Sequence, residues 1–300
     1  MRDRAGSPQP MENVIFLRSA ALANYGSAYL RADQLCQIAN ECTTSKAAGA
    51  RVLTHADDLR DSLVVLNKTF LIENGADAIA TIRASGNVIA SDFVDLPIAR
   101  DICEVSDILV SSSLTQHDFL RTNYANKPTV HIPHHADLRI CAAIDRNMAV
   151  NVGYFGAIYN GLYLEELTRE GLCDVIPATT ANDTQWMMKL PCYRCHYAVR
   201  AQQSFDGFKP FIKGAVAARI GAVILTTRDE ETVRNLGDDY PFFVPPSLEA
   251  IRQKILMLRE GARDEDWRTA MLAMANLRDH CSRERVSLAI ADLVECAKAI

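Results

Sequence analysis

Three cations lie close together in the second half of the sequence, and their types and spacing suggest chemistry with an anion. Arg200 ends an apolar run, and Lys209 and Lys213 follow, four residues apart, at the start of an expected helix. The helix macrodipole disfavours positive charge at that end by up to about 1 kcal/mol. Either these side chains are ordinary solvated charge, or something anionic binds there. A diphosphate would require such cations, helix-end amides and small side chains, and Gly214 and Ala215 follow directly.

A second segment could supply backbone amides to the same anion. The sequence "VGYFGAIYN" is an expected strand that leads into a turn of small residues at Gly156 and Ala157. Such a turn lets a ligand approach backbone N–H groups at the start of a helix. We therefore expect the amides near Gly156 and Ala157 to contribute to a phosphate site.

Three short motifs match metal or haem sites, and each has a simpler interpretation. Cys192–His196 fits the haem attachment pattern C-x-x-C-H, but it runs into an expected strand, and no second Cys/His pair completes a zinc site. Asp264–Asp266 precedes an expected helix, where acidic residues favour the helix start. His131, His134 and His135 lack a supporting carboxylate or cysteine cluster. The sequence therefore predicts no bound metal and no haem.

Composition excludes several classes of protein. The chain has 300 residues, of which 49% are hydrophobic, and a net charge of -5, which argues against general binding to nucleic acid. Its nine cysteines have no spacing typical of a disulfide framework, so we expect a reducing, cytoplasmic environment. No apolar run approaches the roughly 18 residues of a membrane span, which leaves peripheral membrane association open.

Familiar cofactor and hydrolase motifs are also missing from the sequence. It contains no G-x-G-x-x-G, no G-x-x-x-x-G-K-[ST] and no G-x-S-x-G. A dinucleotide cofactor, a P-loop and an α/β-hydrolase triad are therefore not indicated.

The elements that must position these residues alternate between short apolar strands and helices. This order predicts an α/β fold with parallel sheets covered on both faces. The pattern restarts near residue 151, so we expect two Rossmann-like domains facing across a cleft, which is the default ligand site. Expected strands are 13–18, 51–56, 62–69, 87–93, 107–113, 128–134, 151–156, 173–178, 195–200, 222–227 and 241–245, and expected helices include 73–86, 114–125, 162–170, 265–279 and 282–299.

We expect four ranges along the chain. Residues 1–12 are polar and expected to be disordered, and 13–140 form the N-terminal, acceptor-binding domain. Residues 150–281 form the C-terminal, donor-binding domain, and the helix in 282–300 packs back toward the N-terminal domain.

Several of these stretches resemble GT-B glycosyltransferases, the class with two Rossmann-like domains that uses nucleotide-sugar donors. "SDILVSSSLTQHDFLRTNYANKPTVHIPHHADL" resembles the segment that leads to the interdomain crossover. "VVLNKT" with "NVIASDFVDLP" resembles the "K…D..D" of short bacterial, retaining-type members. "VGYFGAIYN" resembles the first strand of the donor domain, and "YAVR…FKPFIKGAVAARIGAVIL" resembles the donor-phosphate segment. The resemblance covers most of residues 13 to 260 and rests on order and context.

The resemblance implies transfer of a sugar from a nucleotide-diphosphate sugar to a glycan, lipid or small-molecule acceptor. The nucleotide sugar is a co-substrate, and neither a separate cofactor nor a metal at the phosphate is implied. Arg200, Lys209 and Lys213, with amides near Gly156 and Ala157, would stabilise the charge that develops on the leaving diphosphate.

The acceptor side is implied to lie in the N-terminal half. Asp92 or Asp95, at a strand end, could act as the base or hold acceptor hydroxyls, and His134 could contact the transferred sugar. Helix capping and loop hydrogen bonds are the alternative roles for the two aspartates, and a buried, satisfied histidine is the alternative for His134. A loop containing Tyr25, Gly26 and Ser27 stands where such enzymes have a glycine-containing loop facing donor and acceptor.

The sequence departs from the family at the acids that many retaining members carry. If Gly221 aligns with the family's glycine, the two usual glutamates fall on Phe208 and Val216, whose side chains cannot hydrogen-bond a ribose or a sugar. The alternative function is therefore a non-catalytic GT-B-like module that binds a nucleotide sugar or a protein partner. Another GT-B enzyme, such as a sugar-nucleotide epimerase, is a third possibility without specific support.

Overall fold

The computed structural model describes residues 13–47, 49–141, 143–145, 148–200 and 206–300. The expected disordered segment, residues 1–12, lies outside this part of the chain. Contacts divide the described residues into two compact units. The first unit runs up to Ser112 and includes Gln116–Ile132 and Val286–Ile300, and the second contains Ser113–Thr115 and Pro133–Arg285.

The first unit is built on a six-stranded parallel sheet with the order β2-β1-β3-β4-β5-β6. All six residues of the central strand β3 are buried, as expected for a strand covered on both faces. The strands are β1 (Asn13–Leu17), β2 (Arg51–Leu53), β3 (Ser62–Asn67), β4 (Val88–Asp92), β5 (Ile108–Ser111) and β6 (Thr129–His131). Its apolar core includes Ile15, Val64, Ile89 and Leu109.

Helices of the first unit connect these strands and cover them. They are α1 (Gly26–Ala28), the π-helix η1 (Tyr29–Asp33), α2 (Gln34–Glu41), the 3-10 turn η2 (Thr43–Ser45), α3 (Lys68–Glu73), α4 (Ala76–Ala84), α5 (Arg100–Val105), α6 (Leu114–Asn123) and α13 (Arg283–Lys298). The apolar stripe of α13, which includes Val286, Ile290 and Leu293, is buried. Ser287 on this helix is within hydrogen-bond distance of Thr44. The helix therefore completes the core of the first unit.

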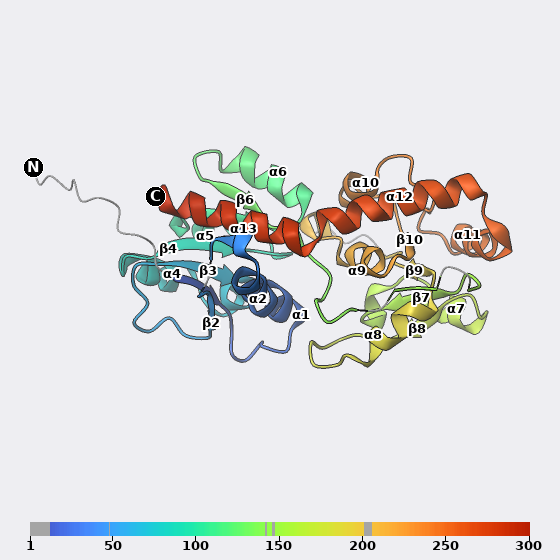
Figure 1. Ribbon diagram of the computed structural model, residues 1–300, viewed down its shortest axis with the longest axis horizontal. Helices are drawn as coiled ribbons and strands as arrows, with labels where there is room; N and C mark the ends of the chain where they lie inside the picture. Colours follow the sequence, from blue (N-terminus) through green and yellow to red (C-terminus); the bar gives the residue numbers. More distant parts are fainter. Residues whose placement is uncertain (1–12, 48, 142, 146–147, 201–205) are drawn as a thin grey trace, which may run out of the picture. The chain divides into compact units, whose positions relative to one another are not determined.

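The second unit has its own, separate parallel sheet of four strands with the order β10-β9-β7-β8. The strands are β7 (Val152–Phe155), β8 (Asp174–Ile176), β9 (Cys195–Tyr197) and β10 (Val223–Leu225). Helices α9 (Ile212–Ile220) and α12 (Asp264–His280) pack on each other and on this sheet (Figure 1). The remaining helical elements are η3 (Ile158–Asn160), α7 (Leu164–Arg169), α8 (Gln185–Lys189), η4 (Leu190–Cys192), η5 (Asp206–Phe208), α10 (Glu230–Leu236) and α11 (Leu248–Gly261).

The prediction of an α/β fold with two separate parallel sheets is confirmed, but one expected strand is wrong. Residues 241–245 form no strand and contribute only an isolated bridge between Phe243 and Thr226. Pro241 and Pro245 bound this segment, and proline has no N–H to donate to a ladder. The expected strand 62–69 also ends early, at Asn67, because the Asn67 side chain accepts from the Thr69 N–H and caps α3.

Tyr240 closes the free edge of the second sheet. It is buried, and its hydroxyl donates to the Ile224 carbonyl at 2.7 Å and accepts from the Ile224 N–H at 3.0 Å. Since β10 is an edge strand, these two bonds replace those of a missing neighbour.

We expect Tyr240→Phe to lower the free energy of unfolding by about 2–4 kcal/mol, because two buried backbone groups lose their partner. Urea denaturation followed by circular dichroism measures this change. Tyr159→Phe is the matched control, since Tyr159 is 86% exposed and its hydroxyl has no such role. Equal stability of the two variants would show that solvent or a shifted strand satisfies Ile224.

Candidate functional site

Lys213 lies in the first turn of α9 and packs against the turn that follows β7. Its ammonium group donates a hydrogen bond to the Phe155 carbonyl oxygen and lies 4.0 Å from the centroid of the Tyr154 ring. Gly156 has a φ of +150°, and a Cβ built there would lie 2.6 Å from Lys213 Nζ. A glycine is therefore required at 156 both by the backbone and by the lysine.

Lys213 lies close enough to Arg200 and Lys209 for the charges of both to act on it. Burial, together with smaller contributions from the nearby charges of Lys209 and Arg200, lowers the pKa of the Lys213 ammonium from 10.5 to about 7. The charges of Lys209 and Arg200 thus disfavour the ammonium form of Lys213. An anion placed among these side chains would offset that effect.

The prediction that both lysines lie at the start of one helix is wrong. The helix begins only at Ile212, so Lys209 belongs to the preceding loop. Pro210 follows Lys209 and disfavours helical geometry at the residue before it. Packing explains the glycine at position 214, because a Cβ built there would lie 2.2 Å from the Phe211 ring.

The small-residue turn at Gly156 and Ala157 is already partly bonded within the second unit. The Gly156 N–H donates to the Ile176 carbonyl at 3.3 Å, and the Tyr154 hydroxyl donates to the Ala157 carbonyl at 2.5 Å. These bonds hold the turn in place beside Lys213. The absence of a side chain at Gly156 leaves room there for the lysine ammonium group.

A cavity of about 460 Å³ lies in the second unit beside Arg200. It is lined by Arg200, Gly207, the segment 227–231 that follows β10, and the segment 243–246. Its volume falls within the usual range for a small-molecule site. Arg200 lines the cavity, and its charge also acts on Lys213.

Three acidic residues line the cavity, Asp229, Glu230 and Glu231, and they differ in exposure and in hydrogen bonding. Asp229 caps α10 in a capping box with Thr232. Glu231 is buried and accepts hydrogen bonds from the N–H groups of Leu114 and Thr115, at 3.1 and 3.0 Å. Glu230 is exposed and lines the cavity. The carboxylate of Glu230 is thus the one best placed to meet a ligand.

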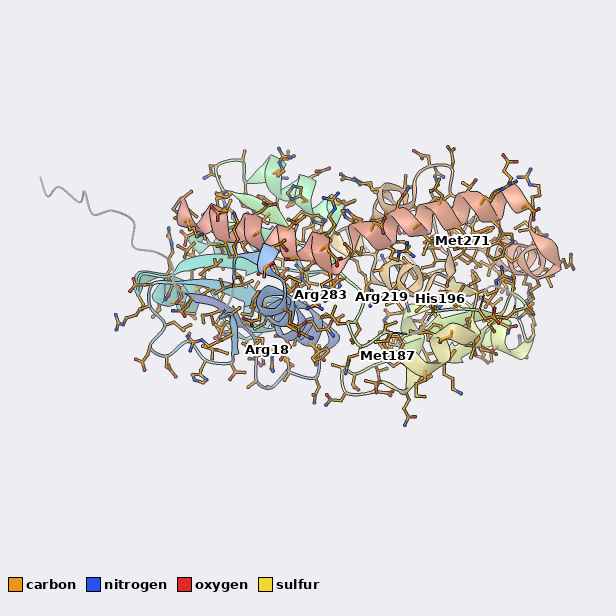
Figure 2. The ribbon with its side chains drawn as sticks, viewed as in Figure 1. Arg18, Met187, His196, Arg219, Met271 and Arg283 are labelled. Carbon is orange, nitrogen blue, oxygen red and sulfur yellow. The ribbon has the colours of Figure 1, made fainter. Side chains whose placement is uncertain are left out.

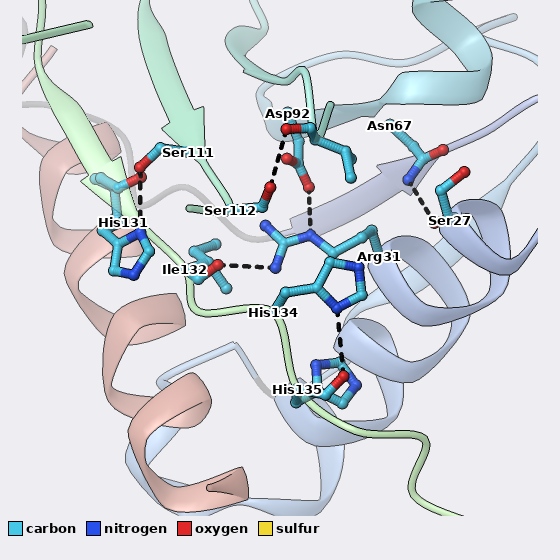
Figure 3. A network of polar contacts seen from close by, with 12 residues as sticks. Ser27, Arg31, Asn67, Asp92, Ser111, Ser112, His131, Ile132, His134 and His135 are labelled. Carbon is cyan, nitrogen blue, oxygen red and sulfur yellow. Dashed lines mark hydrogen bonds and ion pairs between the residues drawn. The ribbon is translucent and has the colours of Figure 1, made fainter. Parts of the chain in front are cut away.

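In the first unit, Asp92 ends β4 and is fully buried. Its carboxylate accepts a hydrogen bond from Arg31 Nε at 2.8 Å, and both side chains are 0% exposed. Arg31 also donates to the Ile132 carbonyl at 2.8 Å (Figure 3). Asp95 instead pairs with Lys68 and remains 30% exposed. Of the two expected aspartates, only Asp95 is therefore accessible to an acceptor.

The expected histidine and loop residues occupy separate environments. His134 belongs to the second unit, is buried, and has its Nδ1 3.3 Å from the His135 carbonyl (Figure 3). Tyr25 is exposed and precedes α1, which Gly26 begins. The Ser27 carbonyl accepts from Asn67 Nδ2 at 3.1 Å, so this loop is anchored to the end of β3.

The discounted motifs have structural roles. His196 lies inside the second unit (Figure 2), and burial lowers its pKa to about 3. Asp266 pairs with Arg263 in the first turn of α12. Among the residues that the structure describes, no group of three His, Cys, Asp or Glu side chains could hold a metal ion. No described helix is long and apolar enough to cross a membrane.

Sequence analysis did not identify several residues that shape these sites. Tyr154 and the Phe155 carbonyl hold Lys213, and Arg31 neutralises Asp92. Lys68 was quoted within a motif, but its pairing with Asp95 was not predicted. The "VGYF" strand was the available signal for Tyr154, whereas nothing in the sequence distinguishes Arg31 from a surface arginine.

The sequence matches no known family model and no curated protein. Solved structures with similar folds include a sucrose-phosphate synthase from Thermosynechococcus elongatus, with a TM-score of 0.61, 12% identity, and coverage of 94% of this chain and 98% of that chain. A second is an alpha-glucosyltransferase in complex with UDP and a 13-mer DNA, with a TM-score of 0.56 and 9% identity. The match covers 92% of this chain and 99% of that chain. A third is a chain of the GtfA/B complex, with a TM-score of 0.54 and 9% identity. This match covers 80% of this chain but only 58% of that chain. The chain therefore has the GT-B fold.

We expect the stability contribution of Lys213 to depend on pH. The unfolded lysine keeps its proton up to about pH 10.5 and the folded one loses it near pH 7, so the unfolded state binds more protons between these values. The free energy of unfolding of the wild type therefore rises with pH in this window. Between pH 7 and pH 9 it should rise by about 2 kcal/mol relative to that of Lys213→Met.

Urea unfolding at both pH values tests this expectation. Lys189→Met is the control. Because Lys189 is exposed, the free energy of unfolding of this variant should change with pH as that of the wild type does. A constant difference between wild type and Lys213→Met at the two pH values would contradict the assignment.

Proposed function

We propose that the protein is a glycosyltransferase that transfers a sugar from a nucleoside-diphosphate sugar to an acceptor hydroxyl. The observation that carries the proposal is the position of Arg200, which lines the cavity of the second unit and is near enough to Lys213 for its charge to lower the pKa of that ammonium. A nucleoside in the cavity would place its diphosphate against Arg200, Lys209 and Lys213. The GT-B fold, shared with sugar-transferring enzymes, supports this reading.

The chemistry of the proposed donor site is electrostatic. The bond between the sugar and the diphosphate breaks, and negative charge grows on the leaving diphosphate. Arg200, Lys209 and Lys213 stabilise that charge. In this proposal the three cations, and no metal ion, neutralise the charge on the diphosphate.

We assign the ribose contact to Glu230. The positions of the family's two glutamates hold Phe208, whose carbonyl accepts from Ser113, and Val216, which is part of the core. A carboxylate is a suitable acceptor for ribose hydroxyls. Because Glu230 lines the cavity and is exposed, it takes the place of the missing acids.

On the acceptor side, we assign Asp95 as the base and Asp92 as a positioning residue. Asp95 is accessible, and Lys68 holds its carboxylate in place. Asp92 is buried with Arg31, and removal of one member of such a pair leaves an uncompensated charge. His134 remains assigned to the transferred sugar, and the loop of Tyr25, Gly26 and Ser27 to the ligands.

A non-catalytic nucleotide-sugar-binding module is the second candidate, and Phe208 and Val216 favour it. Incubation with a panel of nucleotide sugars and candidate acceptors separates the two functions. Release of a nucleoside diphosphate that Asp95→Asn abolishes, while donor binding persists, supports the enzyme. Binding of a donor with no release under any acceptor supports the module.

Replacing Lys213 by Ala should weaken binding of a nucleoside diphosphate at least tenfold, because each charge-assisted hydrogen bond to a phosphate is worth about 1.5–3 kcal/mol. Calorimetric titration of uridine, guanosine, adenosine and cytidine diphosphates into wild type and variant at pH 7 measures this. Lys189→Ala removes an exposed lysine of the same unit and should leave the affinity unchanged. Equal affinities of wild type and Lys213→Ala would place the phosphate elsewhere.

A further inference from the structure

Val94 has a backbone conformation that its residue type rarely adopts. Its φ is +57°, and a β-branched residue in this left-handed region is an outlier. Val94 is buried, whereas the other described non-glycine residues with a positive φ are exposed or half-buried, namely Lys46, Asp58, Asp61 and Tyr163. Backbone strain of this kind persists only where the surrounding structure enforces it, and it concentrates at functional sites.

Val94 occupies the second position of a four-residue turn that follows β4. The turn runs from Phe93 to Leu96 and is closed by a hydrogen bond from the Leu96 N–H to the Phe93 carbonyl at 3.0 Å. A positive φ at the second position of a turn is normally supplied by glycine, asparagine or aspartate. The third residue of the turn is Asp95, so the conformation of Val94 sets the direction in which the Asp95 side chain leaves the backbone.

Two buried side chains hold the carbonyl oxygen of Val94. Ser112 Oγ donates a hydrogen bond to this oxygen at 3.0 Å, and Gln116 Nε2 donates another at 3.1 Å. Gln116 Oε1 accepts from the Ser112 N–H at 3.0 Å, so the three residues form a closed ring of hydrogen bonds. Because these bonds are shielded from water, they constrain the peptide more strongly than exposed bonds would.

The turn places Asp95 within reach of Lys68, which follows the neighbouring strand. Lys68 begins α3 directly after β3, and β3 and β4 pair in the sheet. The Asp95 carboxylate forms an ion pair with the Lys68 ammonium, and both side chains keep part of their surface exposed. Ser112 follows β5, which pairs with β4 on its other side (Figure 3). The carboxylate is therefore held by Lys68, and the turn that carries it by Ser112 and Gln116.

We propose that Ser112 and Gln116 are positioning residues for the base of the transfer reaction. They keep Val94 in the left-handed conformation and thereby direct the Asp95 carboxylate toward the acceptor hydroxyl. The inference rests on the proposed function for the role of Asp95 as the base, whereas the constraint on Val94 lies wholly within the first unit. A displacement of about 1 Å at a reacting group can cost about a hundredfold in rate, so a constraint on this turn would matter for catalysis.

Steady-state kinetics of nucleoside diphosphate release test the proposal, with the nucleotide sugar and acceptor that the wild type turns over. Gln116→Met and Ser112→Ala each remove one donor to the Val94 carbonyl, and each should lower kcat at least about tenfold. The KM for the nucleotide sugar should change by less than about twofold, because the donor is assigned to the second unit.

Ser106→Ala is the matched control for Ser112→Ala. Ser106 is also a buried serine, and its Oγ donates to the Ile102 carbonyl at 2.7 Å. It precedes β5 and so lies at the opposite edge of the sheet from Asp95. This variant should lose stability as Ser112→Ala does, as measured by thermal unfolding, but keep the wild-type kcat.

Rescue at position 94 separates positioning from a general loss of stability. Glycine adopts a positive φ without steric cost, so Val94→Gly removes the need for the two hydrogen bonds. In the Val94→Gly background, Gln116→Met should therefore lower kcat by less than about threefold. The same factor in both backgrounds would mean that Gln116 acts by another route, and it would overturn the inference.

Crystal structures of the wild type and of the double variant Ser112→Ala/Gln116→Met test the geometry without any activity. The double variant should show a negative φ at Val94 and an Asp95 carboxylate displaced from Lys68. If the double variant does not fold, the structure of Ser112→Ala is compared in the same way.

An unchanged φ and an unchanged Lys68–Asp95 pair in the variant would overturn the inference and leave the proposed function standing. A wild-type kcat in both Gln116→Met and Ser112→Ala would do the same. If the wild type releases no nucleoside diphosphate from any nucleotide sugar, the proposed function fails and the catalytic role of the turn fails with it. The crystal structures then still decide whether Ser112 and Gln116 hold Asp95 in place.

Discussion

The contact of the Lys213 ammonium group with the Tyr154 ring and the Phe155 carbonyl is the interaction on which the proposed donor site depends. A side chain at residue 156 would displace Nζ from this position, and the φ of +150° there independently favours glycine. The contact also explains why α9 tolerates a cation in its first turn. The helix gains nothing electrostatically from Lys213, so the structure retains a local cost that an anionic ligand would remove.

The first unit uses the opposite arrangement at the carboxyl edge of its sheet. Arg31 and Asp92 neutralise each other in a fully buried pair, and Arg31 also satisfies the carbonyl of Ile132. The neighbouring pair of Lys68 and Asp95 is partly exposed. Arg31 with Asp92 and Lys68 with Asp95 form ion pairs in the first unit, whereas the charges of Lys209 and Arg200 act on Lys213 in the second, which is why we assign the diphosphate to the second unit.

The sequence predicts the fold well because the apolar strands are short, regular and separated by helices. It fails where tertiary context decides. Residues 241–245 are apolar enough for a strand, but their prolines prevent a ladder. Helix α11 was not predicted, although the Ser247 cap and the spacing of Leu248, Ile251 and Ile255 could have indicated it.

Only part of the candidate site could be predicted. Residue type and spacing single out Arg200, Lys209 and Lys213, and in the structure the charges of the first two act on the third. The exact helix start was not predictable, since Pro210 and the packing of Phe211 set it. The burial of Asp92 depends on Arg31, a residue far away in the sequence, so no local pattern could separate it from the accessible Asp95.

A crystal structure of the protein with a bound nucleoside diphosphate tests the central claim most directly. The account predicts phosphate oxygens within about 3.2 Å of Lys213 Nζ and of the Arg200 guanidinium, with the nucleoside in the cavity beside Glu230. A bound nucleotide whose phosphates contact none of Arg200, Lys209 and Lys213 would contradict it.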